Sequence, residues 1–416
     1  MRLPLICFVF LNFLHQQVLA DNSLNDEQCV SDNKSECGEE RENQLFDSAR
    51  KYGKDSNEIY RKIHKALSEY KPWIPMEHEP TCGLYAEVIK RDLKPYQSNG
   101  ITRQMITDAA KLGTHYKIYN KTLYREEDCM FPTRCKGVEH FLLKLVNELP
   151  DMDIIINTRD WPQVKKVFKT KGPVFSFSKT NEYLDIMYPA WSFWAGGPAI
   201  SLYPTGIGRW DLLREEITKA AEKTPWAKKK SRGFFRGSRT SDERDALILL
   251  SRQNPDLLNA QYTKNQAWKT KKDTLNAEPA KEVDFKHHCK YKYLFNFRGV
   301  AASFRLKHLF LCKSLVLHVG DEWNEFFYFA LKPWVHYVPV KSYANEQEIE
   351  NLLNYFQEND DIAQQIAMRG YEFVKIHLRM EDIECYWKKL LTDYKSLLKY
   401  TVMEDNSLQV IEPNNI

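Results

Sequence analysis

The chain has 416 residues, with 60 Lys plus Arg against 56 Asp plus Glu, so its formal net charge is +4. A hydrophobic content of 43% and an aromatic content of 13% exclude a largely disordered chain, because they supply enough apolar surface for a core. A net charge this small does not indicate a nucleic-acid-binding protein or one that binds an acidic membrane surface. A length near ~400 residues predicts roughly two or three compact domains.

The first twenty residues have the pattern of a secretory signal peptide. A positive start at Met1-Arg2 precedes an apolar run, Leu3 to Leu14, and small or aliphatic residues lead up to Ala20. The alternative is a membrane anchor, but the apolar run is too short to cross ~30 Å of hydrocarbon. No later segment approaches ~18 consecutive apolar residues. We therefore expect cleavage after Ala20, no transmembrane helix, and a mature chain inside the secretory pathway.

The cysteines fit an oxidising compartment. Eight remain once Cys7 leaves with the signal peptide, and an even number in a secretory chain predicts disulfides. Short spacings favour three pairs: Cys29–Cys37, Cys129–Cys135 and Cys289–Cys312. Cys82 and Cys385 are left to join the two ends of the fold, although eight cysteines allow ~105 connectivities. Sequons at Asn33 and Asn120 predict N-glycosylation of a luminal chain.

The first half of the chain alternates helical and strand patterns. Residues 21–41 are polar and acidic and predict a loosely held arm. The expected elements that follow are a helix over 42–70, a helix over 139–149, a buried strand over 152–157 and a strand over 173–177.

The second half alternates in the same way. The expected strands cover residues 233–235, 291–297, 314–319 and 335–340, and the expected helices cover 242–251, 300–311, 346–358, 361–377 and 381–400. Strands that alternate with helices indicate parallel sheets with right-handed crossovers. Two such units, with a boundary in the region 205–230, predict two Rossmann-like α/β domains that face each other across a cleft.

Two strand-turn-helix segments could bind an anion. In the first, Phe234 to Arg244, three arginines surround the expected start of a helix, and Thr240 with Glu243 has the spacing of a capping box. In the second, Lys290 to Arg305, small residues occupy the expected first helical turn, where free N–H groups favour a diphosphate. The alternatives are a surface turn with scattered arginines and an ordinary βα unit.

A third segment could supply a general base. Asp160 lies in Asn157-Thr158-Arg159-Asp160-Trp161-Pro162, just beyond the buried strand, where α/β proteins place their ligands. A carboxylate there can accept a proton from a hydroxyl. The alternative is an aspartate that only caps the loop.

A fourth segment, Trp191 to Pro204, is rich in aromatic residues and could line a groove for a partner or form part of the core. Two metal-like patterns are weaker. Asp151-Met152-Asp153 has the spacing found in metal-dependent sugar transferases, but it opens an apolar strand. His287-His288-Cys289 has no third ligand nearby, and a disulfide claims its cysteine.

At these motifs the chain resembles the Rumi-type protein O-glucosyltransferases, within the capsule-associated-protein-like family of glycosyltransferases, and looks like an invertebrate member. The segments that carry the resemblance are Asn157–Pro162, Trp191–Tyr203, Phe235–Arg244, Cys289–Phe310 and Val319–Trp323, within a match from about Tyr60 to Tyr400. The run Cys-Lys-Tyr-Lys-Tyr-Leu-Phe-Asn-Phe-Arg-Gly is too long to arise by chance.

The resemblance implies a GT-B fold and an inverting, metal-independent enzyme. It would move glucose from UDP-glucose to the Ser of C-x-S-x-[PA]-C in folded EGF repeats, such as those of Notch, in the endoplasmic reticulum lumen. It implies an N-terminal acceptor-binding domain over 42–215, a UDP-sugar-binding domain over 216–378, and a C-terminal helix and tail over 379–416 that return to the first domain. No metal or other cofactor is expected.

The resemblance also implies roles for individual residues. Asp160 would be the general base. Contacts to the UDP-sugar would come from Arg236, Gly237, Ser238, Arg239, Thr240, Arg244, Val283, Asp284, Phe285, Ala301, Ala302, Ser303, Phe304 and Arg305. Contacts to the EGF repeat would come from Met130, Phe131, Pro132, Thr133, Arg134, Pro198, Ala199, Ile200, Ser201, Leu202, Tyr203 and Pro204.

Two other functions fit the same motifs. The donor could be UDP-xylose, since a pocket discriminates one hydroxymethyl group by only ~1–3 kcal/mol. The protein could also be a non-catalytic luminal factor that binds EGF repeats. The family often ends in a KDEL-like tetrapeptide, whereas this sequence ends Glu412-Pro413-Asn414-Asn415-Ile416, so the resemblance does not extend to retention in the endoplasmic reticulum.

Overall fold

A computed structural model describes residues 57–168, 172–197, 202–203, 206–265 and 268–413. The chain divides into two units, Met1–Lys62 and Ile63–Ile416. The signal peptide, the acidic arm, the Cys29–Cys37 pair and the Asn33 sequon lie outside the described residues. Of the predicted helix over 42–70, residues 57–69 are described and are helical.

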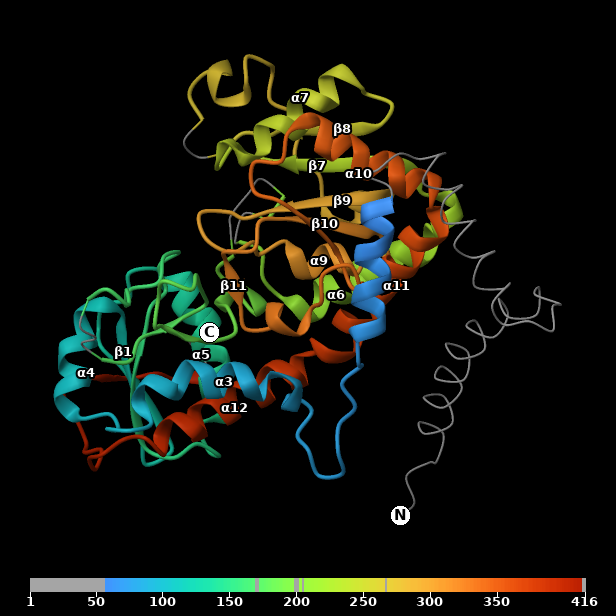
Figure 1. The fold of residues 1–416 in the computed structure, drawn as a ribbon. Coiled ribbons are helices and arrows are strands. Elements are labelled where there is room, and N and C mark those ends of the chain that lie inside the picture. The colour runs from blue at the N-terminus through green and yellow to red at the C-terminus, as the bar shows by residue number, and fades with distance from the viewer. Residues whose placement is uncertain (1–56, 169–171, 198–201, 204–205, 266–267, 414–416) are drawn as a thin grey trace, which may run out of the picture. The chain divides into compact units, whose positions relative to one another are not determined.

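A five-stranded parallel sheet forms much of the second half of the chain (Figure 1). Its order is β12-β10-β9-β7-β8, with β7 at Lys230–Gly237, β8 at Leu258–Tyr262, β9 at Tyr291–Phe297, β10 at Leu315–Val319 and β12 at Val338–Val340. Strand β10 is buried along its whole length, as a central parallel strand with both faces covered should be. The predicted strands of this half are confirmed, although β7 extends further and β12 is shorter than expected.

The helices around this sheet are α6 (Trp210–Lys223), α7 (Asp245–Gln253), α8 (Phe285–His288), α9 (Leu306–Phe310), α10 (Glu346–Glu358) and α11 (Asp360–His377). Helix α10 has the predicted bounds, and Asn345 with Glu348 forms a capping box at its start. The predicted helix over 300–311 is wrong in its first half, because the chain runs through bends and turns before α9 begins.

The first half contains a six-stranded sheet of order β13-β2-β1-β3-β4-β6. The strands are β1 (Thr114–Tyr119), β2 (Thr122–Arg125), β3 (Met152–Ile156), β4 (Phe175–Ser176), β6 (Ile186–Met187) and β13 (Gln409–Val410). Only β3, β4 and β6 run parallel, so the expectation of a fully parallel sheet is wrong here. The α/β class itself is confirmed.

The hairpin between β1 and β2 explains part of that difference. Its two turn residues, Asn120 and Lys121, have φ of 47° and 58°, as the tight two-residue turn of a hairpin requires. The sequence lacks the Asn-Gly pair that marks such turns most clearly. The side chain of Asn120, the predicted glycosylation site, is exposed at this turn.

The helices of the first half are α3 (Ala86–Leu93), α4 (Arg103–Ala109) and α5 (Pro132–Leu145). Helix α5 begins well before the predicted residue 139. Pro132 occupies its first turn, where a missing N–H costs nothing. Gly137 lies within it because a Cβ there would come within 2.6 Å of the Trp191 carbonyl oxygen.

The last helix returns to the first half of the chain, as predicted. This helix, α12 (Met380–Lys395), donates hydrogen bonds from Tyr386 to the Met187 carbonyl and from Tyr394 to the Asp153 carbonyl. Strand β13 then pairs with β2. A separate two-stranded ladder joins β5 (Ser178–Lys179) to β11 (Asn324–Glu325).

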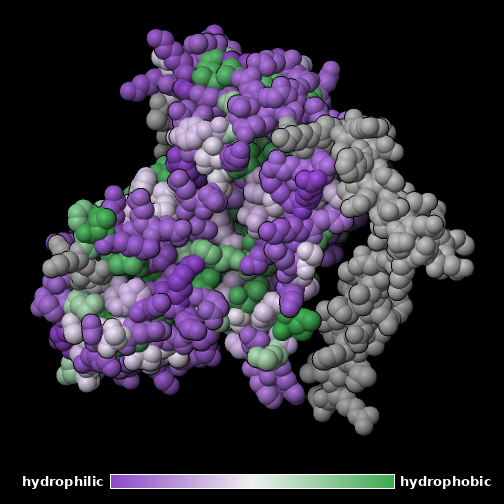
Figure 2. Space-filling model, viewed as in Figure 1, coloured by the Kyte–Doolittle hydropathy of each residue, from purple (hydrophilic) through white to green (hydrophobic). Residues whose placement is uncertain are grey.

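Figure 2 shows a largely hydrophilic face on which hydrophobic residues form small separate groups. Over the described part of the chain, no helix combines the length and apolar character needed to cross a membrane.

Three of the predicted disulfides are confirmed: Cys82–Cys385, Cys129–Cys135 and Cys289–Cys312. Cys82–Cys385 spans 303 residues and Cys289–Cys312 spans 23. A crosslink stabilises mainly by restricting the unfolded chain, and it does so more strongly for a longer loop.

We therefore expect a larger loss of stability when the long-range disulfide is removed. The double variant Cys82→Ala/Cys385→Ala should lose about 2 kcal/mol more unfolding free energy than Cys289→Ala/Cys312→Ala. Guanidinium denaturation of the two variants and the parent, under the same oxidising conditions, measures this difference. Equal losses would show that loop entropy does not dominate.

The Asp153 carboxylate is bound to polar side chains in a buried cluster and is not free to bind a metal. Its oxygens lie 2.9 Å from His115 Nε2, 3.5 Å from Lys117 Nζ and 3.0 Å from the Tyr400 hydroxyl. Burial raises the pKa of Asp153, but these partners outweigh burial, and the pKa lies below its usual value of 3.8. Within the described ranges, no group of three or more His, Cys, Asp or Glu could hold a metal ion.

This shift predicts a pH-dependent contribution to stability. A lowered folded-state pKa stabilises the protein above the unfolded pKa of about 4, and the contribution is lost as the pH falls through the folded value. The difference in unfolding free energy between the parent and Asp153→Asn should therefore shrink below about pH 4. Urea denaturation from pH 3 to pH 7 measures it, with Asp151→Asn as the control; a difference that stays constant with pH would contradict the argument.

Candidate active site

A small, open recess lies at the carboxyl edge of the five-stranded sheet. Its lining comes from the segments that follow β7, β9, β10 and β12, because the carboxyl ends of parallel strands meet at one edge. The lining residues are Glu243, Arg298, Ala302, Ser303, His318, Val319, Gly320, Glu322, Trp323, Tyr328 and Ser342. This is the edge at which α/β proteins bind ligands.

The segment 299–305 closes on itself instead of starting a helix. The Gly299 N–H donates to the Ala301 carbonyl, and the Ser303 hydroxyl donates to Asn296 Oδ1 at 2.8 Å. Helix α9 is only five residues long and begins after this turn. The predicted anion site on its first helical turn is therefore wrong in its helical part, but Ala302 and Ser303 do line the recess.

Two guanidinium groups, the buried Arg244 and the half-buried Arg305, lie at this edge without a counter-ion among the described residues. Arg244 donates to the carbonyl oxygens of Ser238 and Arg298, and Arg305 Nη1 donates to the Arg236 carbonyl at 2.6 Å. Among the described residues, no carboxylate lies within 4.0 Å of either group. The Nε–H of Arg244 is buried and has no partner there.

The electrostatics of the two groups reflect this arrangement. Burial, followed by repulsion from Arg305, lowers the pKa of Arg244 to about 9. Burial lowers the pKa of Arg305 to about 10. Adjacent cations that are largely withdrawn from water and have only carbonyl acceptors are stabilised when an anion binds to them. The two arginines are therefore candidate ligands for an anion.

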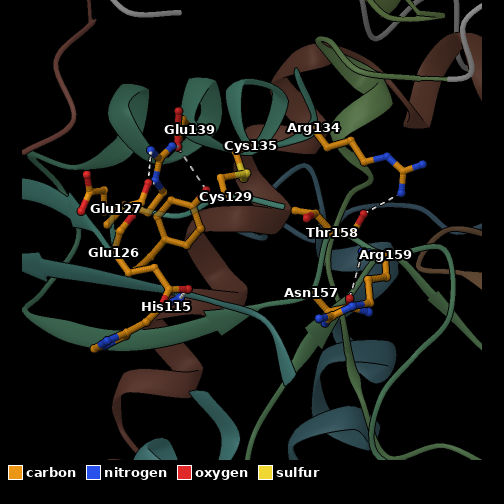
Figure 3. The surroundings of a disulfide bond; sticks show 12 residues. His115, Glu126, Glu127, Cys129, Arg134, Cys135, Glu139, Asn157, Thr158 and Arg159 are labelled. Atoms are coloured by element: carbon orange, nitrogen blue, oxygen red, sulfur yellow. Dashed lines mark hydrogen bonds and ion pairs between the residues drawn. A yellow bond between two sulfur atoms is a disulfide. The ribbon is translucent and has the colours of Figure 1, made fainter. Parts of the chain in front are cut away.

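The segment that carries Asp160 borders the recess. The Trp161 ring meets the Trp323 ring edge-on at 4.8 Å, and Trp323 lines the recess. The guanidinium of Arg134, on α5, donates to the Thr158 carbonyl at 2.6 Å (Figure 3). The same guanidinium lies 3.4 Å from Asp160 Oδ1. The Asp160 side chain keeps 36% of its surface exposed, so a substrate hydroxyl can reach it. An accessible carboxylate is thus carried by a segment that borders the recess.

Residues 77–416 match glycosyl transferase family 90. The chain belongs to this family. It is 60% identical over 391 residues to the O-glucosyltransferase rumi of Drosophila melanogaster, and the match covers 94% of each chain. It is 55% identical over 376 residues to protein O-glucosyltransferase 1 of Homo sapiens, with 89% of this chain and 94% of that protein covered. The predicted resemblance is confirmed, and this family 90 member is a glycosyltransferase.

Among solved structures, the chain is similar to HepE of Anabaena in complex with UDP-glucose. The sequences are 13% identical, the TM-score is 0.32, and the match covers 44% of this chain and 53% of that one. A similarity this low supports no argument about the site.

The other two arginines predicted for the donor site form hydrogen bonds with neighbouring residues of the same chain. Arg236 donates to the Asn259 carbonyl and to Asn259 Oδ1, and Arg239 donates to both carboxylate oxygens of Asp245. Of the three arginines expected around the helix start, only Arg244 lacks a carboxylate or side-chain acceptor among the described residues. Gly237 leaves room for Arg305, since a Cβ there would lie 3.1 Å from Arg305 Nη2.

The predicted capping box of Thr240 and Glu243 does not form. The segment opens with a 3₁₀ turn, Asp242–Arg244, whose N-cap residue Ser241 makes no side-chain capping bond. The Thr240 hydroxyl lies 3.3 Å from the Ser238 hydroxyl. Glu243 instead accepts a hydrogen bond from Arg298 Nε at 2.7 Å. Glu243 and Arg298 both line the recess.

The predicted nucleoside residues lie beside α8 and α9 and do not line the recess. Asp284 caps α8 by accepting the His287 N–H, and Phe285 stacks on His308 with ring centroids 4.4 Å apart. Val283 packs against the core. Phe304 turns toward a different cluster and stacks on Phe177 at 4.9 Å.

The predicted acceptor residues are described only in part. Pro198, Ala199, Ile200, Ser201 and Pro204 lie outside the described residues, whereas Leu202 is exposed and Tyr203 stacks on Phe285. Met130 is exposed, the Phe131 ring lies under the Arg134 guanidinium, and Pro132 with Thr133 opens α5. Earlier in the aromatic segment, Trp191 and Phe193 are fully buried, so that part belongs to the core.

Several recess residues were not predicted from the sequence. A usable signal existed for Arg298 and for Gly320, Glu322 and Trp323, because these residues follow predicted strands of a parallel sheet. No local signal distinguishes Tyr328 or Ser342.

Proposed function

We propose that this protein is an inverting, metal-independent protein O-glucosyltransferase that acts in the endoplasmic reticulum lumen. It transfers glucose from UDP-glucose to the Ser of C-x-S-x-[PA]-C in folded EGF repeats, such as those of Notch. Family membership and the identity to rumi support the reaction class. The observations that carry the mechanism are two adjacent arginines without a carboxylate partner among the described residues and, on a segment that borders the recess, a carboxylate that is accessible to an acceptor.

The arginine pair suits the diphosphate of the donor. Arg244 and Arg305 bring two positive charges to one edge of the sheet, and Arg244 retains a free buried N–H. The leaving diphosphate gains negative charge as the glycosidic bond breaks, and preorganised cations stabilise that charge. We further assign the other donor contacts as the resemblance implies, from Arg236 to Thr240, Val283 to Phe285 and Ala301 to Phe304.

Asp160 acts as the general base. A serine hydroxyl is a weak nucleophile, so its proton must leave as its oxygen bonds to the anomeric carbon. The Asp160 carboxylate accepts that proton while UDP leaves from the opposite face of the sugar, which inverts the anomeric centre. Arg134 holds the carboxylate beside the acceptor side of the recess.

The proposal assigns the acceptor to residues 42–215 and the donor to residues 216–378, in a GT-B arrangement closed by 379–416. Within the first range, Met130 to Arg134 and Pro198 to Pro204 would contact the EGF repeat. The exposed Met130 and Leu202 support an apolar contact surface there.

UDP-xylose is the alternative donor, because the two sugars differ by one hydroxymethyl group. A non-catalytic EGF-binding factor is the third possibility, and it would not need Asp160 or the arginine pair.

Mass spectrometry of a folded EGF repeat tests all three. The repeat, carrying C-x-S-x-P-C, is incubated with the protein and either UDP-glucose or UDP-xylose in EDTA. We expect one hexose on the Ser. Xylose alone would change the donor and keep the mechanism. EGF binding without any sugar transfer would replace the enzyme by a binding protein, and transfer that requires an added divalent metal would contradict metal independence.

A further inference from the structure

Two fully buried residues hold the loop that carries Asp160 from its two ends. Asn157 follows β3 immediately, and its Nδ2 donates to the Trp161 carbonyl at 2.7 Å while its Oδ1 accepts the Arg159 N–H at 2.9 Å. Asp185 lies 25 residues further along the chain than Asp160, just before β6, yet it binds the other end of the same loop.

The Asp185 carboxylate accepts two backbone N–H groups of that loop. The Gln163 N–H donates to Oδ1 and the Val164 N–H donates to Oδ2, each at 2.7 Å. Asp185 and Asn157 have no exposed surface. A buried carboxylate with two amide donors and no freedom to rotate fixes the positions of both amides.

Ser176, on β4, joins the two ends. Its hydroxyl accepts from Asn157 Nδ2 at 2.9 Å and donates to Asp185 Oδ1 at 2.7 Å. The polar chain from Asn157 through Ser176 to Asp185 is therefore continuous, and each hydrogen has one acceptor. Such fully satisfied buried networks make a local structure rigid.

The network leaves the Asp160 side chain itself free of buried partners. Backbone groups of the residues on both sides of Asp160 are held by side chains of the network. The carboxylate faces the exposed side, with Arg134 as its ion-pair partner among the described residues. A base whose backbone is fixed and whose carboxylate is accessible suits proton transfer, because misplacement by ~1 Å can cost about 10²-fold in rate.

We propose that Asn157, Ser176 and Asp185 are positioning residues for the general base. They touch neither the donor nor the acceptor, and they act through the loop that carries Asp160. This inference rests on the proposed function of Asp160.

Two serines of the same region provide a matched test. Ser176→Ala removes the hydroxyl that joins Asn157 to Asp185. Ser178→Ala removes an equally buried hydroxyl, two residues away, that has no hydrogen-bond partner among the described residues. Each variant loses one buried hydroxyl oxygen, but only Ser176→Ala removes hydrogen bonds of the network.

We expect Ser176→Ala to lower kcat for O-glucosylation by about 10–100-fold. The KM for UDP-glucose and for the EGF repeat, and the affinity for UDP, should stay within twofold of the parent. Ser178→Ala should keep the parent kcat. Asn157→Asp, which keeps the side-chain volume but removes both amide donors, should lower kcat in the same selective way. It provides the test if Ser176→Ala does not fold.

Asp160→Asn in the same assay separates two failures. If Asp160→Asn keeps full activity, the proposed base is wrong. If Asp160→Asn is inactive but folded Ser176→Ala and Asn157→Asp keep the parent kcat, the positioning role is wrong. A parallel loss of kcat, UDP affinity and melting temperature would also overturn it, since that pattern indicates only a structural role.

Discussion

Replacing Asp160 by Asn should lower kcat for glucose transfer by about 10²–10⁴-fold, which is the usual contribution of general acid–base catalysis. The amide has almost the same shape as the carboxylate but cannot accept the proton of the serine hydroxyl. The arginine pair that we propose for the donor lies on a different segment, so UDP affinity should change little. Steady-state kinetics with the EGF repeat, together with calorimetric titration of UDP, measures both quantities.

Asp151→Asn is the matched control, because Asp151 precedes β3 and Asp160 follows it. The Asp151 carboxylate accepts only the Asn120 N–H in the described structure, a bond that the Asn side-chain oxygen can also accept. It should therefore transfer glucose at the parent rate. If Asp160→Asn loses UDP affinity in proportion to kcat, the base and the donor site are not separate.

Removing either Arg244 or Arg305 should weaken UDP binding by about 10–100-fold. A hydrogen bond to a charged group contributes ~1.5–3 kcal/mol, and each ~1.4 kcal/mol corresponds to a tenfold change in affinity. Arg244→Ala and Arg305→Ala should show this loss in calorimetric titrations with UDP. Neither variant should change the affinity for uridine, because uridine lacks the phosphates.

A control arginine separates the lost charge from the lost packing. Arg369, on α11, is half-buried and donates to the Val335 carbonyl, and burial lowers its pKa too. Arg369→Ala should bind UDP as the parent does. An equal loss of uridine and UDP affinity in Arg305→Ala would instead indicate that the turn which Arg305 holds to Arg236 has collapsed.

The parallel sheet of the second half could be predicted because its strands are continuous apolar runs. Residues 291–297 are mostly apolar and contain no polar stretch long enough to end a strand. Strand β10 is entirely buried. Helix α10 could be predicted because Asn345 and Glu348 have the spacing of a capping box at the start of an amphipathic segment. These signals depend only on residues close together in the chain, so they can be recognised in a single sequence.

The failures have in common that a distant residue competes with a local signal. Thr240 and Glu243 have the spacing of a capping box, but Glu243 pairs with Arg298, 55 residues away. The small residues 301–303 suit a helix start, but the Ser303 hydroxyl binds Asn296 and the turn closes before the helix begins. A single sequence contains no information on which distant partner will win.

The candidate site divides in the same way. Asp160 could be predicted because it follows a buried strand, and Ala302 and Ser303 because they follow a Gly turn. Asp185 could not, because nothing around it in the sequence connects it to a loop that begins 28 residues earlier. The unpaired state of Arg244 also became visible only from the structure, since Arg239, five residues earlier, is paired with Asp245.

The return of the C-terminal helix also constrains the order in which the protein can be made. Cys82 must wait for Cys385, and the sheet edge at β2 must wait for β13. At ~5–20 residues per second, a ribosome needs roughly 15–60 s to synthesise the 303 residues between the two cysteines. During that time the first half is held without its last helix, so its apolar face and Cys82 thiol remain available to chaperones and oxidoreductases. We infer that the first half cannot complete its fold during synthesis, and that chains which terminate before α12 fail in the half that was made first.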